Sequence, residues 1–519
     1  MGSIGLLGID IGGTSIKAVV CDENGTVLAK SSAPTMPAYY GSGQKTDTGP
    51  QRRFKAETLW KITSMVIREV IEKLPQGCQI NSAAVSSVGC TMLAFDRYGS
   101  QIMIQADSSV LEQEYAKLSS WYDREEFEKM TGYPLESSLT GLHLTGCCDF
   151  EGRIEKVFCV DDFIVYKLTG IRSRNYSTAA SNGMWDSRQK TWIEFLKQRT
   201  GLSDKELGEP SDSGVLVGTV SKEAADETGL STRVKVSTGG MDYQCAAFSI
   251  NNLIGDNLFN ITGTIDLLAY YSRWDRPNTE GFRCIRDYHV VPGVRDVMVE
   301  TVGAAQTEWL KNDVIAQNKY GFSLDWEMFF QELEVQYQNQ MTHKEIFIPQ
   351  VFGSYVPFVN RNATGMFAGL NGETDSLMLL RTLLEGMAYQ TKRMADYLSG
   401  GKYGQKLILV GGGSRNKTWV QLKADIMGMD IILPSVQEAS AVGAALLGAV
   451  GAGFYGSYRE AGSVTEGHHY DYVEYDNVRS KYFNDVYNDV YLPLIKQWEL
   501  INRRVSIINE RYGKNNENS

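Results

Sequence analysis

The segment GIDIGGTSIKAVVCDENGTVL, residues 8–28, holds two apolar strands separated by a bend with unusual chemistry. The first strand carries Asp10 near its end, and the bend consists of Gly12, Gly13, Thr14 and Ser15. Glycines let backbone N–H groups approach an anion, and hydroxyls add further donors. A carboxylate beside bound phosphates can hold Mg²⁺. We therefore expect a phosphate-binding hairpin with Asp10 at the metal, although a simple tight turn shows the same pattern.

A second strand–bend–strand segment, LFNITGTIDLLAYYS, covers residues 258–272. Its bend consists of Thr262, Gly263 and Thr264, and no acid precedes it as Asp10 precedes the first bend. The repetition of this strand–bend–strand pattern predicts two similar α/β halves. We expect a cleft between them that binds the ligand, because ligands bind preferentially where domains meet. Two such bends could grip a polyphosphate from both sides, and a single metal ion needs an aspartate on only one of them.

A third candidate site is LILVGGGSRN, residues 407–416, where a buried strand ends in three glycines and a helical pattern follows. Bare backbone at the carboxyl end of a strand suits a flat ligand such as adenosine, and the helix start adds polar groups. A plain strand-to-helix loop is the alternative. The residues that we expect at the adenosine are Gly411, Gly412, Gly413, Ser414 and Asn416.

Asp242 is the best candidate for a catalytic group. It follows two glycines in STGGMDYQCAAFS, residues 237–249, where a strand ends and a helix starts. The helix N-terminus favours the carboxylate form, so we expect Asp242 to be ionised at neutral pH. An ionised acid there could orient a substrate hydroxyl and accept its proton late in phosphoryl transfer. A helix-capping aspartate is the other interpretation.

Composition narrows the choice of function. The chain has 519 residues and a net charge of −11, which disfavours non-specific binding to nucleic acids. Neither the Gly-x-x-x-x-Gly-Lys-Ser/Thr loop nor the protein-kinase motif set is present, and the five histidines form no zinc-binding pattern. No signal peptide and no confident membrane span are predicted, so we expect a cytoplasmic protein without a membrane partner.

In this order, the segments resemble the FGGY family of carbohydrate kinases over about residues 4–495. The closest match to the family is the segment at 409–453, and weaker matches lie at 161–192, 218–249 and 346–370. The resemblance implies an α/β fold with two ribonuclease H-like domains of the actin and hexokinase type, separated by a cleft. We place the N-terminal domain at 1–252, the C-terminal domain at 253–460, and a helical tail packed on the latter at 461–519.

The resemblance also implies the reaction, which is transfer of the γ-phosphate of ATP, with Mg²⁺, to a hydroxyl of a small-molecule sugar. Asp242 would be the catalytic residue and would contact both sugar and metal, and Asp10 would be the second metal ligand. The two bends and Lys17 would bind the phosphates. Homodimers are usual in this family, so a homodimer is the expected assembly if the chain associates.

The sugar site departs from the family pattern. Xylulose kinases have Gln-Met-His, and glycerol kinases Gln-Arg-Glu, where this chain reads Val88-Gly89-Cys90. The family's Trp-x-Asp-x-Arg keeps only Asp107, with Ser108 and Ser109 after it, and Tyr355 replaces an arginine. The substrate-binding candidates are Cys90, Thr91, Asp107 and Asp242.

The general arrangement of the motifs along the chain favours a ketopentose such as D-xylulose as the acceptor. Another ketose, a polyol or an autoinducer-2-like substrate is the alternative within the kinase class. Outside it, the altered sugar site leaves open a non-catalytic sugar-sensing regulator built on a kinase scaffold. An actin- or chaperone-like ATPase fits less well, since the segments at 161–192 and 409–453 are those of sugar kinases.

Overall fold

The structure is a computed structural model of the whole chain. It describes residues 3–513 except 39–53, 103–115, 117–118, 121–122, 136–138, 140, 142–143, 145–152, 251–256, 273–283, 316–325, 355, 357–359, 361, 400–405, 437 and 466–469. Asp107, Ser108, Ser109 and Tyr355 lie outside the described residues.

The first half is organised around a seven-stranded sheet with strand order β10-β11-β4-β1-β2-β3, in which β12 also pairs with β4. β1 is antiparallel to β2 and parallel to β4, which confirms the hairpin predicted at 8–28. The strands are β1 (Ile4–Ile11), β2 (Ser15–Cys21), β3 (Val27–Pro34), β4 (Gln79–Ser87), β10 (Leu216–Thr219), β11 (Lys235–Ser237) and β12 (Gly240–Met241).

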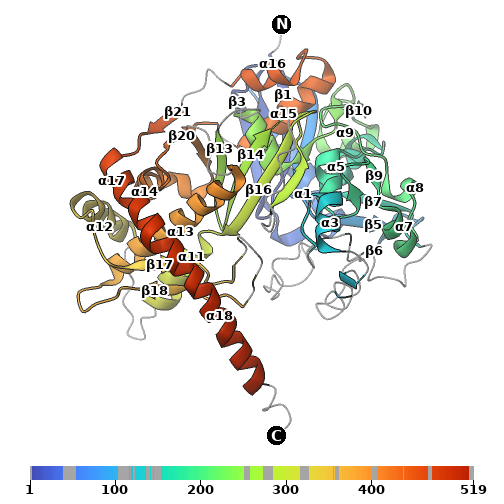
Figure 1. Cartoon of the computed structure of the whole chain (residues 1–519). Coiled ribbons are helices and arrows are strands. Elements are labelled where there is room, and N and C mark those ends of the chain that lie inside the picture. The colour runs from blue at the N-terminus through green and yellow to red at the C-terminus, as the bar shows by residue number, and fades with distance from the viewer. Residues whose placement is uncertain are drawn as a thin grey trace.

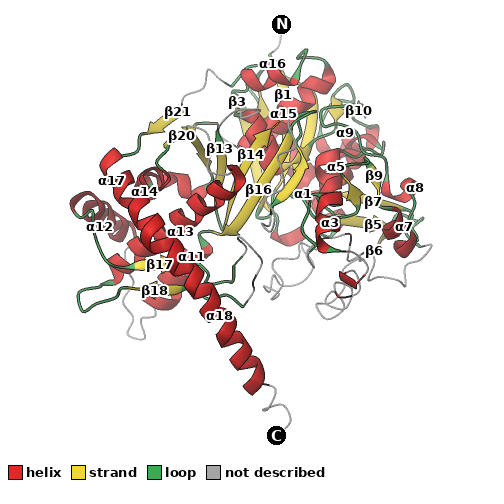
Figure 2. Cartoon of the chain, viewed as in Figure 1, coloured by secondary structure: helices red, strands yellow, loops and turns green. Residues whose placement is uncertain are grey.

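The second half is organised around another seven-stranded sheet, of order β15-β16-β14-β13-β19-β20-β21. Its strands are β13 (Leu258–Thr262), β14 (Ile265–Ser272), β15 (Ile285–Tyr288), β16 (Arg295–Val302), β19 (Lys406–Val410), β20 (Asp430–Pro434) and β21 (Tyr470–Val473). The run β16-β14-β13-β19-β20 repeats the orientations of β3-β2-β1-β4-β11, two antiparallel pairs and then two parallel ones. The prediction of two similar α/β halves is thereby confirmed (Figure 2).

Helices cover both faces of the first sheet, which explains why β1 is apolar almost throughout. Helix α1 (Ala56–Glu72) buries Leu59 and Ile67 in one cluster with Leu7 and Ile9. Helix α15 (Ala439–Ala452) packs on β1 and β4, and Figure 1 shows it next to β1. The approach is so close that a Cβ on Gly8 would lie 1.7 Å from the carbonyl oxygen of Ala441.

Helix α15 also packs against α10 (Asp242–Ser249), where a Cβ on Gly443 would lie 1.9 Å from the carbonyl oxygen of Cys245. The chain therefore returns from the second sheet to the first before it ends. Residues 439–452 fall within the predicted C-terminal domain, yet they pack on the sheet of the first half. The boundaries at 252 and 460 stay predictions, and this helix crosses the division that they describe.

The C-terminal segment packs mainly on the second half. Tyr487 and Tyr491 are buried beside Tyr389 of α13 (Ser376–Ser399), in one apolar cluster with residues of α14 (Lys417–Met427). The segment comprises α17 (Asn477–Val486), a π-helical turn at Tyr487–Tyr491, and α18 (Leu492–Gly513), whose end extends away from the body in Figure 1. Among the described residues, no helix is both long and apolar enough to span a membrane.

Short elements complete the fold. In the part of the chain that the structure describes, three small sheets are formed by β6-β5-β7, by β8-β9 and by β17-β18. Their strands are β5 (Met92–Phe95), β6 (Gln101–Ile102), β7 (Lys156–Cys159), β8 (Trp185–Asp186), β9 (Thr191–Trp192), β17 (Ile346–Ile348) and β18 (Met366–Ala368). The other α-helices of the described residues are α3 (Arg124–Thr131), α5 (Val160–Thr169), α6 (Tyr176–Ala180), α7 (Glu194–Thr200), α8 (Asp204–Leu207), α9 (Lys222–Thr228), α11 (Ala305–Trp309), α12 (Trp326–Asn339) and α16 (Tyr458–Ser463).

Candidate active site

Asp10 lies near the end of β1, opposite Ser86 of β4 and Lys17 of β2 in the sheet register. Its side chain is buried, and the hydroxyl of Ser86 donates a hydrogen bond of 2.9 Å to Oδ1. Burial raises the pKa of Asp10 to about 7, and the negative charge of Asp242 adds to the increase. The structure thus brings these two acids within electrostatic reach of each other.

Asp242 is the first residue of α10, directly after β12. The backbone N–H of Tyr243 donates to its Oδ1 at 2.8 Å, and the residue at the capping position is Met241. Because β12 pairs with β4 at Gly240 and Ser86, Asp242 follows the strand end that also supports Asp10.

The pair of carboxylates fits a divalent cation. Oxygen ligands from carboxylates are those that Mg²⁺ prefers, and a cation near Asp10 would offset the charge that burial and Asp242 make unfavourable.

The first bend is a compact turn. The N–H of Gly12 donates to the carbonyl oxygen of Ser15 at 3.0 Å, and the Thr35 hydroxyl donates to the carbonyl oxygen of Gly12 at 2.9 Å. Thr14 is exposed at its tip, and Gly12 and Gly13 are partly exposed. The bend therefore offers solvent-accessible backbone beside the buried acid of β1.

Lys17 projects from β2 toward the start of α15. Its Nζ lies 2.7 Å from Oε2 of Glu438, the residue that precedes this helix. The backbone of Glu438 is left-handed, with a φ of 54°. A predicted phosphate ligand is thus paired with an acid from the other end of the chain.

The second bend and the glycine run lie together. A Cβ on Gly411, whose φ is 102°, would lie 2.4 Å from the carbonyl oxygen of Thr262, and one on Gly413 would lie 2.7 Å from the Thr262 hydroxyl. The parallel pairing of β13 with β19 brings the two strand ends side by side. The Gly303 and Ala304 amides donate to the bend at 2.9 and 2.7 Å. Only glycine fits at 411 and 413 without displacing the bend.

The polar side chains after the glycine run serve the local fold. Asn416 caps α14 by accepting a hydrogen bond of 3.0 Å from the N–H of Trp419, and the Ser414 hydroxyl donates to the carbonyl oxygen of Gly411 at 2.7 Å. The indole of Trp419 donates to the hydroxyl of Thr262 at 3.3 Å. The start of α14 and the second bend therefore form one hydrogen-bonded unit.

The expected sugar-site loop reaches the same region from β4. A Cβ on Gly89 would lie 2.3 Å from the terminal methyl of Met241, so Met241 fills the space that a side chain at position 89 would need. Cys90 is left-handed with a φ of 53°, and its N–H donates to the Ser181 hydroxyl at 3.0 Å. Thr91 is buried and donates to the carbonyl oxygen of Gly89. The loop thus contacts the residue before Asp242.

Sequence reasoning missed several residues that support these groups. Ser86 could have been noticed, since two serines end the apolar strand that precedes Val88. Glu438 and Trp419 gave no such signal, because an acid before an alanine-rich helix and an apolar helix residue are both common. Their importance comes from partners that are distant in the chain.

Comparison with known proteins identifies the family of this chain. Residues 6–249 match the N-terminal domain of the FGGY family of carbohydrate kinases, and residues 299–452 match its C-terminal domain. The chain belongs to the FGGY family of carbohydrate kinases. This FGGY chain is therefore a sugar kinase with ATP as its phosphate donor, and the predicted family is confirmed.

Relatives of this FGGY kinase carry different substrate names. It is 23% identical to a xylulose kinase of Bacillus subtilis, covering 88% of this chain and 90% of the relative. It is 22% identical to an autoinducer-2 kinase of Klebsiella pneumoniae, covering 96% and 93%. The crystal structure of a xylulose kinase from Rhodospirillum rubrum superposes with a TM-score of 0.82 at 22% identity, covering 95% and 100%. The predicted fold of the actin and hexokinase type is thereby confirmed.

Proposed function

We propose that this kinase phosphorylates a hydroxyl of a ketopentose such as D-xylulose. Similarity to xylulose kinases over most of the chain supports this choice. Similarity to autoinducer-2 kinases supports the alternative of an autoinducer-2-like acceptor, and another ketose or a polyol is the remaining alternative. Val88 and Cys90 stand where the pattern of xylulose kinases has Gln and His, so the acceptor would meet a different set of partners from the one typical of xylulose kinases.

Asp242 is the proposed catalytic base. Its carboxylate would accept the proton of the acceptor hydroxyl as the oxygen bonds to the γ-phosphorus and the bond to the β–γ bridging oxygen breaks, leaving ADP. The helix start at Asp242 favours the ionised form before that transfer. Its position beside Asp10 at the end of β4 is the observation that carries the proposal.

We assign Asp10 and Asp242 as the residues that would hold Mg²⁺, which neutralises charge on the transferring phosphates when bound. The phosphates would lie against the two bends and Lys17. The adenosine would lie at Gly411–Ser414 and Asn416, where glycine backbone meets the start of α14.

A substrate panel tests the proposal. We would follow ADP production from ATP and Mg²⁺ with ketoses, aldoses, polyols and an autoinducer-2 analogue, and we expect the largest kcat/KM with a ketopentose. Asp242→Asn should lower kcat by about 10²- to 10⁴-fold, the usual contribution of a general base. Asp476→Asn is the matched control, since Asp476 caps the exposed start of α17. A fully active Asp242→Asn enzyme would remove Asp242 from this role.

Binding without turnover would point to a different function. Stabilisation by a sugar with no ADP release across the whole panel would favour the sugar-sensing regulator. A larger kcat/KM for a polyol or an autoinducer-2 analogue would replace the ketopentose and leave the base assignment intact.

We also propose a cytoplasmic enzyme that works without nucleic-acid or membrane partners, consistent with the net charge of −11. A homodimer is the proposed assembly. Light scattering of the purified chain would measure its mass directly.

A further inference from the structure

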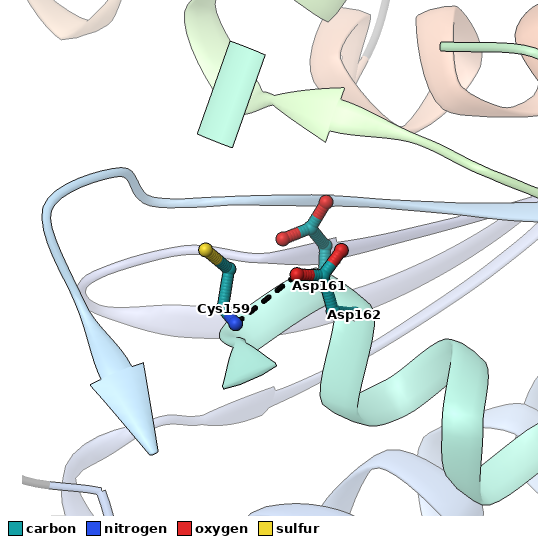
Figure 3. Close-up of side chains that lie close together, drawn as sticks. All are labelled: Cys159, Asp161 and Asp162. Carbon is teal, nitrogen blue, oxygen red and sulfur yellow. Dashed lines mark hydrogen bonds between the residues drawn. The ribbon is translucent and has the colours of Figure 1, made fainter. Parts of the chain in front are cut away.

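Three buried side chains gather where β7 meets α5, on the far side of β4 from Asp10. Figure 3 shows Cys159, Asp161 and Asp162 grouped there, with their ligand-type atoms within 4.8 Å of one another. Asp162 serves the local fold, because its Oδ2 accepts from Arg174 Nε at 3.0 Å and from the Cys159 N–H at 3.1 Å. Burial also raises the pKa of the Cys159 thiol, which disfavours metal binding. Asp161 has a different set of partners.

The first oxygen of Asp161, Oδ1, contacts Ser87 of β4. The hydroxyl of Ser87 lies 3.3 Å from Oδ1 of Asp161. The same hydroxyl accepts a hydrogen bond of 3.2 Å from the backbone N–H of Asp161. In the sheet register Ser87 stands opposite Met241 of β12. This route connects Asp161 to β4. Because β4 pairs with β12, it also reaches Met241, the residue directly before Asp242.

The second oxygen of Asp161, Oδ2, is connected to Met241 by a chain of hydrogen bonds. Its Oδ2 accepts from Asn175 Nδ2 at 2.5 Å, and Asn175 Oδ1 accepts from the Ser177 hydroxyl at 2.7 Å. The hydroxyl of Ser177 in turn accepts from the N–H of Met241 at 3.0 Å. All of these side chains are buried. Hydrogen bonds away from water are strong, and chains of them restrict the groups that they connect.

We infer that Asp161 is a positioning residue that fixes the start of α10, and with it Asp242, through Ser87 and through Asn175 and Ser177. The inference rests on the proposed role of Asp242 only for its effect on catalysis. Both routes end at Met241, which is the capping residue of α10 and fills the space beside Gly89. Each oxygen of Asp161 lies within hydrogen-bond distance of a donor group, and an amide in its place would turn one of these acceptors into a donor.

The test is Asp161→Asn, with Asp425→Asn as the matched control. Asp425 is an equally buried acid that accepts from Tyr337 at 2.5 Å in the second half. We expect Asp161→Asn to lower kcat by about 10- to 100-fold, the effect of a small misplacement, with KM for ATP within about twofold. Hydrogen exchange of the Met241 amide should accelerate about tenfold, and the control should change neither quantity. Unchanged kcat and unchanged Met241 exchange in folded Asp161→Asn would overturn the inference.

An exchange of partners distinguishes positioning from a general loss of stability. In the double variant Asp161→Asn, Asn175→Asp the amide and carboxylate trade places, so the hydrogen bond between them can form in the reverse sense. We expect kcat to recover to within about threefold of wild type, since good geometry is what the site requires. A double variant as impaired as the single one would contradict the role of this bond.

If Asp161→Asn does not fold, Ser177→Ala provides the decisive measurement, because it removes the acceptor of the Met241 N–H together with the donor to Asn175 Oδ1. Faster Met241 exchange is expected, and its absence would overturn the second route. The exchange measurements need no sugar. Failure of the proposed function therefore appears in the substrate panel, and failure of the positioning role appears in the exchange of Met241.

Discussion

Lys17 and Glu438 form an ion pair, with 2.7 Å between Nζ and Oε2, that joins the first hairpin to the start of α15. Lys30 of β3 lies 3.6 Å from the other oxygen of Glu438. The contact ties the start of α15 to β2, the strand that follows the bend that we assign to the phosphates of ATP. If Lys17 binds those phosphates as proposed, Glu438 would compete with them for its ammonium group.

Substitutions of this pair separate the two roles. Lys17→Met should raise KM for ATP several-fold if its ammonium binds phosphate, whereas Glu438→Gln should leave KM unchanged or lower it, because Lys17 is then unpaired. The stability change of either variant should be about 1 kcal/mol or less, since both side chains are partly exposed. Equal increases of KM in the two variants would show that the pair acts as a structural unit.

Asp10→Asn should raise the Mg²⁺ concentration needed for half-maximal activity by about tenfold or more, because one anionic ligand is removed. The free energy of unfolding at pH 8 should not fall, since the amide avoids a buried charge near Asp242. Asp22→Asn in the turn between β2 and β3 is the control, as Asp22 accepts hydrogen bonds from the nearby backbone amides of Asn24 and Thr26. An unchanged Mg²⁺ requirement in Asp10→Asn would remove Asp10 from the metal site.

Gly8→Ala should destabilise the fold by about 3 kcal/mol, because the new methyl group would meet the backbone of α15 rather than a flexible side chain. Gly372→Ala is the matched control, since no heavy atom lies within 4 Å of the position that its methyl group would take. Chemical denaturation measures both. A loss below about 0.5 kcal/mol in Gly8→Ala would mean that α15 does not pack tightly on β1.

The stability of this protein should depend on pH through Asp296 of β16. Burial raises its pKa from an ordinary 3.8 to about 7, so the folded chain binds a proton there that the unfolded chain releases. The contribution of Asp296 to stability is therefore complete below about pH 4 and is lost as the pH rises to about 7.

The variant Asp296→Asn has no ionisable side chain at this position. The free energy of unfolding of wild type should fall relative to this variant by up to about 1.4 kcal/mol per pH unit within that window, and then stay constant. Urea denaturation at a series of pH values measures the difference. Parallel curves for the two proteins would show that Asp296 is not protonated in the fold.

Local patterns in the sequence were sufficient to predict the two bends, the glycine run and α1. Strand alternation, glycine-rich bends and helical periodicity depend on neighbouring residues, so the hairpin at 8–28 and its repeat at 258–272 could be predicted. The order of the motifs was sufficient for the family. The identity of the sugar was not, because Gly89 and Cys90 match no familiar acceptor pattern.

The chain's sequence by itself determined two α/β halves, an acid on the strand before one bend and an acid at a helix start. The tertiary structure alone decided that α15 returns to the first sheet, since an alanine-rich helix shows that it is buried but not which sheet covers it. It also decided the pairing of Lys17 with Glu438 and the routes from Asp161 to Met241. These contacts join residues far apart in the chain, and their energies depend on burial and geometry that exist only after folding.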